Sequence, residues 1–220
     1  MNKLIAFGDS FTWGSELADV VASNDILYSN HTWPALLAKK HDMQYMCFAK
    51  PGAGNQTIAR TILSNIDKID TSDLVVINWT WIDRWDFYNL QDQDWVTVRP
   101  SSNVTTVFDR YYFKYFQSEL WDKFENLKSM ALVHSLLKAH DINFIATSID
   151  DLLFDTRFHS PLYITFLQNS IKDDITYFNN NGFYKWAKAN KFKIGENGHP
   201  LEEAHHSAFN YIEENYEFTK

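Results

Sequence analysis

The sequence predicts an α/β protein, a three-layer α/β/α sandwich in which helices cover both faces of a central parallel sheet. Two observations predict this fold class. Four short apolar runs are spread along the chain, and helical patterns lie between and after them. Strands that alternate with helices pair in parallel, because each helix carries the chain back to the edge where the next strand begins.

The apolar runs are continuous and do not alternate between apolar and polar residues. A strand covered on both faces has this pattern, whereas a half-exposed strand alternates. We therefore expect buried strands at residues 3–7, 44–49, 73–79 and 142–149.

Helices are predicted where apolar residues recur at spacings of three and four, the period of one helix face. Four isoleucines follow this spacing between Gln56 and Ile69. Pro34 fits the first turn of a helix that begins at Thr32, where its missing N–H is tolerated. We expect helices over residues 32–40, 56–69, 117–140 and 201–215.

The length and composition fit one domain over residues 1–220. Hydrophobic residues make up 45% of the chain and charged residues 22%, which allows a sizeable core and excludes global disorder. An aromatic-rich stretch around residues 85–116 follows neither period, and we interpret it as an insertion over one end of the sheet. Its rings form either the core of that insertion or a surface that stacks on sugar faces.

The charge and cysteine content limit the partners and the compartment. A formal net charge of −8 argues against nucleic acid and anionic membranes as partners. The single cysteine, Cys47, can form no disulfide within the chain and indicates a reducing compartment. The first apolar run is too short for the apolar region of a signal peptide. A helix needs about 20 apolar residues to cross a bilayer, and no run in the sequence approaches this length. We expect a cytoplasmic protein.

Polar and glycine-rich residues follow three of the predicted strands, at residues 8–10 (GDS), 51–55 (PGAGN) and 78–80 (NWT). In open α/β sheets, ligands bind at the carboxyl ends of the strands. The sequence therefore predicts a functional site where these three segments meet.

A serine in this place reacts as a nucleophile only if a base takes its proton, and histidine suits that role at neutral pH. Among the eight histidines, His199 is the candidate, because it lies in a loop before Pro200, which opens the last predicted helix. Glu196 lies three residues earlier, within reach of the other ring nitrogen. Ser10, His199 and Glu196 would then form a catalytic triad. The same "ENGHP" stretch also fits an ordinary polar turn.

Together these motifs resemble those of the SGNH hydrolases, also called GDSL esterases and lipases. The GDS segment follows the first strand, and "GHP" precedes a helix near the end, as in that family's first and last motifs. The resemblance implies an SGNH-type, flavodoxin-like sandwich and a serine esterase without metal or organic cofactor. Glu196 stands in the place of the family's usual aspartate. Asp9 is then a structural residue of the turn, and His205 a structural histidine of the tail.

The resemblance also implies an oxyanion hole, which this sequence alters. The family's backbone donor after the second strand aligns with Asn55, with Gly54 one residue earlier. In the third motif, Gly-x-Asn-Asp, alignment on Asp83 puts Ile82 at the asparagine position. Loss of one oxyanion donor costs about a hundred- to a thousandfold in rate. The segment "WTWIDR" resembles phage-type branches of the family, which suggests compensation and a phage-encoded protein. The side chains that could compensate are those of Asn78, Thr80 and Arg84.

Two other interpretations use some of the same residues. The segment "GAGNQT" opens a helix after a strand, as a dinucleotide loop does, but Thr57 replaces the third glycine and no acidic residue ends the next strand. A metal site would use neighbouring residues of the tail, whose spacing fits no zinc motif. Those residues are His199, His205 and His206, with Glu202 or Glu203.

We therefore expect an esterase that cleaves a small-molecule or glycan ester, in particular a carbohydrate O-acetyl group, through an acyl-enzyme on Ser10. The alternative is a binding module of the same fold for a glycan or other small ligand, which has lost turnover at Ile82. The sequence leaves the acyl group, the alcohol and the oligomeric state open.

Overall fold

The computed structural model describes residues 2–22, 27–100, 107–157 and 160–216. Its main sheet has five parallel strands in the order β2-β1-β3-β6-β7. All four predicted strands are present, and the fifth, β7, has only two residues, too few to show a period. The strands are β1 (Lys3–Phe7), β2 (Gln44–Cys47), β3 (Leu74–Trp79), β6 (Asn143–Ser148) and β7 (Ile175–Thr176).

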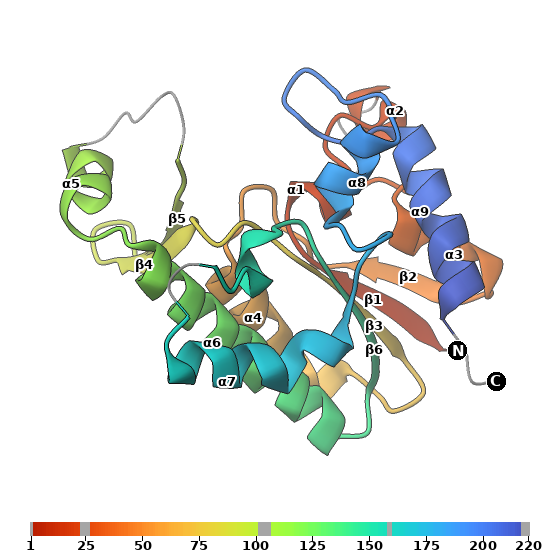
Figure 1. The fold of residues 1–220 in the computed structure, drawn as a ribbon. Helices are drawn as coiled ribbons and strands as arrows, with labels where there is room; N and C mark the ends of the chain where they lie inside the picture. The colour runs from red at the N-terminus through yellow and green to blue at the C-terminus, as the bar shows by residue number, and fades with distance from the viewer. Residues whose placement is uncertain (1, 23–26, 101–106, 158–159, 217–220) are drawn as a thin grey trace.

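Helices cover both faces of this sheet, so the predicted three-layer sandwich is confirmed (Figure 1). One layer contains α4 (Asn55–Leu63), α6 (Glu119–Ala139) and α7 (Leu162–Ile171). The other contains α3 (Trp33–Lys40), α8 (Phe183–Ala189) and α9 (Glu202–Asn215).

The predicted helices match α3, α4, α6 and α9, although α4 ends at Leu63 and a 3-10 turn over Ile66–Lys68 follows it. The sequence patterns did not predict α7 and α8. Two short helices, α1 (Ser10–Trp13) and α2 (Ala18–Ala22), follow β1, and further 3-10 turns lie at Leu152–Phe154 and Lys172–Asp174.

Alternate residues of the strands supply the two halves of the core. In β1, Ile5 and Phe7 pack with the layer of α4, α6 and α7, whereas Leu4 and Ala6 pack with the layer of α3, α8 and α9. This is the reason why the strand reads as a continuous apolar run: both of its faces are buried.

The aromatic-rich segment contains a separate antiparallel hairpin of β4 (Trp85–Asn89) and β5 (Asp94–Val98), and then α5 (Val107–Tyr115). The rings of Trp85 and Tyr112 stack with centroids 4.4 Å apart, and Tyr112 is buried. Other rings of the segment are exposed, among them Tyr111 and Phe116. Its aromatic residues therefore form a small core and also leave rings on the surface. Residues 101–106 of the predicted insertion lie outside the described residues.

Two further observations concern the predicted surroundings of the protein. In the described part of the chain, no helix is both long enough and apolar enough to cross a membrane. Cys47 is a free thiol at the end of β2, and burial raises its pKa to about 11. The thiol therefore stays protonated and unreactive at neutral pH.

Candidate active site

The turn after β1 presents Ser10 at the start of α1, and its two neighbours explain how. Gly8 is required by close packing, because a Cβ there would lie 2.2 Å from Thr12 Oγ1. Asp9 is the N-cap of α1, and its Oδ1 accepts a hydrogen bond of 2.9 Å from the Phe11 N–H. The turn is thus closely determined on both sides of the serine.

The second carboxylate oxygen of Asp9 connects this turn to the segment after β3. Asp9 Oδ2 accepts hydrogen bonds from Thr80 Oγ1 at 2.7 Å and from Arg84 Nη1 at 3.0 Å. Asp9 is fully buried, and the Arg84 guanidinium compensates its charge. The structural role expected for Asp9 agrees with these contacts.

Ser10 and His199 line the same pocket, which has a volume of about 380 Å³. The turn after β1 and the loop before α9 therefore meet at the carboxyl edge of the sheet. Phe11 packs edge-on against the His199 ring, with centroids 5.5 Å apart. We call this cavity the Ser10 pocket; its other lining residues are Trp81, Arg84, Arg99, Tyr184, Asn197 and Gly198.

Glu16 holds the imidazole of His199 in place. The distance from Glu16 Oε2 to His199 Nδ1 is 2.5 Å, and the same carboxylate accepts hydrogen bonds from the backbone N–H groups of Asn197 and His199. Burial opposes ionisation of Glu16, but these hydrogen bonds outweigh it and lower the pKa of the carboxyl. Glu16 is therefore a carboxylate at neutral pH, and His199 Nε2 has no partner among the described residues.

The residue that orients His199 thus differs from the one that the sequence predicts. Glu196 is exposed and forms no hydrogen bond or ion pair with His199 in the described structure. Sequence reasoning missed Glu16, which adopts a left-handed backbone with φ of 67° and belongs to no recognised spacing. The one available signal was an acidic residue in the same loop region as the serine.

Three residues were predicted for the oxyanion hole, Asn55 through its backbone N–H and Asn78 and Thr80 through their side chains; all three side chains are buried and engaged elsewhere. Asn78 Oδ1 accepts a hydrogen bond from Thr147 Oγ1 at 2.9 Å. Asn55 Nδ2 donates to Asn126 Oδ1 and to the Thr80 carbonyl, and its Oδ1 accepts from the Thr80 N–H. Asn55, Asn78 and Thr80 do not line the Ser10 pocket. The bonds between Asn55 and Thr80 join the start of α4 to the residue after β3, and the bond between Asn78 and Thr147 joins β3 to β6.

Arg84 is the predicted compensating side chain that lines the Ser10 pocket. Its Nη1 donates to Asp9 and also to the Ala53 carbonyl, at 2.7 Å. Ile82 points elsewhere: it is buried, and its N–H donates to Asp150 Oδ2 at 2.9 Å. The Arg84 guanidinium therefore lines the same pocket as Ser10, whereas the altered third motif has no asparagine.

The start of α4 is occupied by a carboxylate of the chain itself. Asp86 Oδ2 accepts a hydrogen bond of 2.7 Å from the Thr57 N–H, and a Cβ on Gly54 would lie 2.7 Å from the same oxygen. A phosphate at this helix end would meet that negative charge, so the dinucleotide interpretation finds no support here. The N–H groups of Gly54 and Asn55 have no hydrogen-bond partner among the described residues, and neither residue lines the Ser10 pocket.

The C-terminal histidines do not form a metal centre. His205 is fully buried, its Nδ1 accepts a hydrogen bond from the Trp33 N–H at 3.2 Å, and burial lowers its pKa to about 3. It is a neutral residue that caps the start of α3. The described residues contain no group of three or more His, Cys, Asp or Glu side chains arranged to hold a metal ion.

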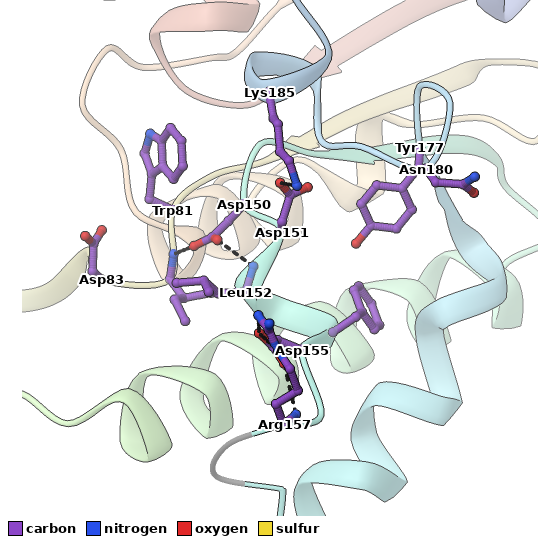
Figure 2. Close-up of a pocket in the computed structure, with 12 residues that line it drawn as sticks. Trp81, Asp83, Asp150, Asp151, Leu152, Asp155, Arg157, Tyr177, Asn180 and Lys185 are labelled. Carbon is purple, nitrogen blue, oxygen red and sulfur yellow. Dashed lines mark hydrogen bonds and ion pairs between the residues drawn. The ribbon is translucent and has the colours of Figure 1, made fainter. Parts of the chain in front are cut away.

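A larger pocket of about 840 Å³ shares Trp81 with the Ser10 pocket. Figure 2 shows the residues that line this larger pocket. We call it the acidic pocket, because four aspartates line it. They are Asp83, Asp150, Asp151 and Asp155, with Ile82, Leu152, Phe154, Arg157, Tyr177, Asn180 and Lys185 as its other walls.

Comparison of the sequence with models of known protein families gives no match, and no curated protein matches it. Solved structures match over nearly the whole chain. The psychrotrophic esterase EstA from Pseudoalteromonas sp. has a TM-score of 0.54 at 11% identity, covering 97% of this chain and 96% of that one. TesA has a TM-score of 0.54 at 12% identity, covering 97% of each chain.

The acetyl xylan esterase Est2A from Butyrivibrio proteoclasticus has a TM-score of 0.52 at 15% identity, covering 97% of this chain and 64% of that one. The chain therefore has the fold of these esterases, and the sandwich implied by the resemblance to SGNH hydrolases is confirmed. A fold hosts many activities, so the reaction has to be argued from the site residues.

Proposed function

We propose that the protein is a serine ester hydrolase in which Ser10 is the nucleophile, His199 the general base and Glu16 the orienting carboxylate. The observation that carries the proposal is the Ser10 pocket itself. Ser10 and His199 line one cavity of about 380 Å³, and His199 Nδ1 is fixed at 2.5 Å from a carboxylate. This leaves Nε2 as the nitrogen available to the serine, the arrangement that a triad requires.

The reaction follows from these roles. His199 Nε2 takes the proton from Ser10 Oγ as that oxygen attacks the ester carbonyl. The tetrahedral intermediate collapses when the imidazolium returns the proton to the leaving alcohol, which leaves an acyl group on Ser10. Water, activated by the same nitrogen, then releases the acid and the free serine. The ionised Glu16 stabilises the imidazolium in both steps.

The oxyanion needs donors, and Arg84 is the strongest candidate. Its guanidinium lines the Ser10 pocket and is held in place by the buried Asp9. The Ser10 N–H at the start of α1 supplies a second donor, whereas Gly54 and Asn55 do not line this pocket. A fixed positive charge near the developing oxyanion stabilises the transition state in a partly dry pocket.

The alternative, a binding module of this fold, is favoured by one observation. The residue at the usual asparagine position, Ile82, is buried away from the Ser10 pocket, so the third motif supplies no oxyanion amide. A protein of this kind would bind its ligand and turn none over. The test below separates the two functions.

The test is labelling with a fluorophosphonate probe, together with turnover of p-nitrophenyl acetate. We expect labelling and turnover in the wild type and neither in Ser10→Ala. Ser15→Ala is the matched control, because Ser15 lies in the same loop region and does not line the pocket. Equal behaviour of the wild type and Ser10→Ala would refute the proposal, and ligand binding without turnover would favour the binding module.

A further inference from the structure

The acidic pocket adjoins the candidate catalytic site at one residue. Trp81 lines both the Ser10 pocket and the acidic pocket, and its ring lies T-shaped against Tyr184 with centroids 5.7 Å apart. A third hollow of about 500 Å³ is lined by Trp81 and Tyr184 as well, and shares Asp151 and Lys185 with the acidic pocket. The three hollows are therefore neighbours around Trp81.

The segment that departs from the family pattern builds this second compartment. Trp81, Ile82 and Asp83 occupy the altered third motif, and all three line the acidic pocket. Figure 2 shows Trp81 and Asp83 on one side of the pocket and Tyr177 on the other, with residues 150–152 between them. The replacement of the motif thus coincides with a cavity whose volume of about 840 Å³ lies within the range of small-molecule sites, about 300–1,000 Å³.

Most charges in the acidic pocket are already satisfied. Asp155 forms an ion pair with Arg157 at 2.6 Å, and Asp151 pairs with Lys185 at 3.1 Å. Asp150 accepts hydrogen bonds from the N–H groups of Ile82 and Leu152. These groups form fixed polar walls and leave no free cation to attract an anionic ligand.

Asp83 and Tyr177 add two less well satisfied polar groups to the pocket. Asp83 is half-buried and forms no ion pair in the described part of the chain. The Tyr177 hydroxyl oxygen is buried, has no hydrogen-bond partner there, and points toward the middle of the pocket residues (Figure 2). A buried hydroxyl without a hydrogen-bond partner destabilises the folded protein, and a ligand hydroxyl beside it would supply that partner. Burial raises the pKa of Tyr177, so the hydroxyl keeps its proton.

We propose that the acidic pocket binds the neutral carbohydrate part of an ester whose acyl group lies in the Ser10 pocket. Aromatic walls at Trp81, Phe154 and Tyr177 offer faces for sugar rings, and Asp83 and Asn180 offer hydrogen-bond partners for hydroxyl groups. The four aspartates against two basic side chains disfavour an acidic sugar. The assignment of the acyl end rests on the proposed function; the binding of carbohydrate does not.

The test measures binding in a protein that cannot turn over substrate. Ser10→Ala is titrated by calorimetry with unesterified tetrasaccharides of xylose, glucose and N-acetylglucosamine, and with tetragalacturonate as the anionic probe. We expect at least one neutral tetrasaccharide to bind, and at least tenfold tighter than tetragalacturonate. Absence of binding by all three neutral sugars, or equally tight binding of the anion, would overturn the proposal.

Two substitutions locate the binding site. Asp83→Asn and Tyr177→Phe, each combined with Ser10→Ala, should weaken binding of that tetrasaccharide at least fivefold. Matched controls are Asp67→Asn and Tyr163→Phe, which change exposed residues outside the pockets and should leave binding unchanged. Unchanged binding in both pocket variants would overturn the proposal.

The same two substitutions, made in the protein that retains Ser10, separate this proposal from the proposed function. They should leave turnover of p-nitrophenyl acetate within twofold of the wild type, because that ester carries no sugar. A loss of turnover in both folded variants would show that the pocket serves the reaction itself and would overturn its role as a sugar site. If Ser10→Ala still hydrolyses esters, the proposed function fails, and the titrations still decide the carbohydrate site.

Discussion

Two histidines of this protein each have a carboxylate beside Nδ1, but the surroundings of Nε2 differ between them. His199 Nδ1 lies 2.5 Å from Glu16, and His134 Nδ1 lies 3.1 Å from Asp174. The Nε2 of His199 faces no partner among the described residues, and its ring lines the Ser10 pocket. The Nε2 of His134, in α6, instead accepts a hydrogen bond of 3.1 Å from Trp79 Nε1 in β3.

The difference shows that a histidine–carboxylate pair alone does not make a base. Burial lowers the pKa of His134 to about 4, so this ring is neutral at pH 7. Since the Trp79 N–H occupies Nε2, the proton of the neutral ring lies on Nδ1 and faces Asp174. The His134 ring joins α6 to β3 through Trp79 and to the 3-10 turn at Lys172–Asp174 through Asp174, so it has no open nitrogen. Chemistry is expected only where the second nitrogen reaches a pocket that also contains a nucleophile.

Substitution of the two histidines should give the largest contrast. His199→Gln removes the proposed base, and we expect kcat for p-nitrophenyl acetate to fall by at least about 10⁴-fold, as in other triads. His134→Gln should change kcat less than about threefold, because no step of the proposed mechanism uses that ring. Steady-state kinetics of the two folded variants checks this. Similar losses in both would contradict the division between an open and a closed histidine.

Substitution of the two carboxylates should also lower kcat more at Glu16 than at Asp174, but the loss should be smaller than for His199→Gln. Glu16→Gln keeps a hydrogen-bond acceptor beside His199 but removes the negative charge, so we expect kcat to fall by about 10²- to 10⁴-fold. Asp174→Asn is the matched change at His134 and should leave kcat nearly unchanged. Glu196→Gln is a second control, because Glu196 is exposed and does not contact His199 in the described structure. A large loss in Glu196→Gln with none in Glu16→Gln would restore the assignment expected from the sequence.

The smallest expected effect concerns stability as a function of pH. The pKa of His134 is lowered from 6.5 to about 4, so between these values the unfolded chain binds a proton that the folded protein excludes. The free energy of unfolding therefore falls as the pH is lowered through this window, by at most about 1.4 kcal/mol per pH unit from this group. In His134→Gln this contribution is absent, and the free energy should fall less steeply.

Urea unfolding at pH 7, 6 and 5 measures the two slopes. His140→Gln, a change of an exposed histidine at the end of the same helix, should behave as the wild type. Asp122, whose pKa burial raises to about 7, titrates in all three proteins and cancels in the comparison. Parallel slopes in wild type and His134→Gln would contradict a buried neutral His134.

The fold could be predicted because helices cover both faces of the sheet, so the central strands β1 and β3 are almost fully buried and the edge strand β2 partly so. Continuous apolar runs located β1, β2, β3 and β6, and three-four spacing located the helices between them. The two-residue β7 has no period to detect. The pattern of α7 is obscured because Leu162 and Phe166 are apolar but exposed. Local pattern does not distinguish an exposed apolar residue from a core residue.

In the candidate site, the sequence predicted only those residues that lie in a short motif next to a strand or a helix. Ser10 follows a strand directly and His199 precedes a helix directly, so both lie in short, recognisable motifs. Glu16 lies 183 positions from His199, and only the tertiary structure brings the two together. Glu16 also has a left-handed backbone, a conformation that a glutamate in the sequence does not indicate. Likewise, Asn78 bonds Thr147 of β6 and Thr80 bonds Asn55 of α4, contacts that the strand-end argument did not consider.

The bond between Glu16 and His199 has a consequence for biosynthesis. Synthesis proceeds from the N-terminus, and early segments can fold while later ones are still missing. The turn that carries Ser10 leaves the ribosome long before residues 195–199, so the proposed nucleophile lacks its proposed base during most of translation. Under the proposed function, a nascent chain of this protein would therefore be inert toward esters until the last helix docks.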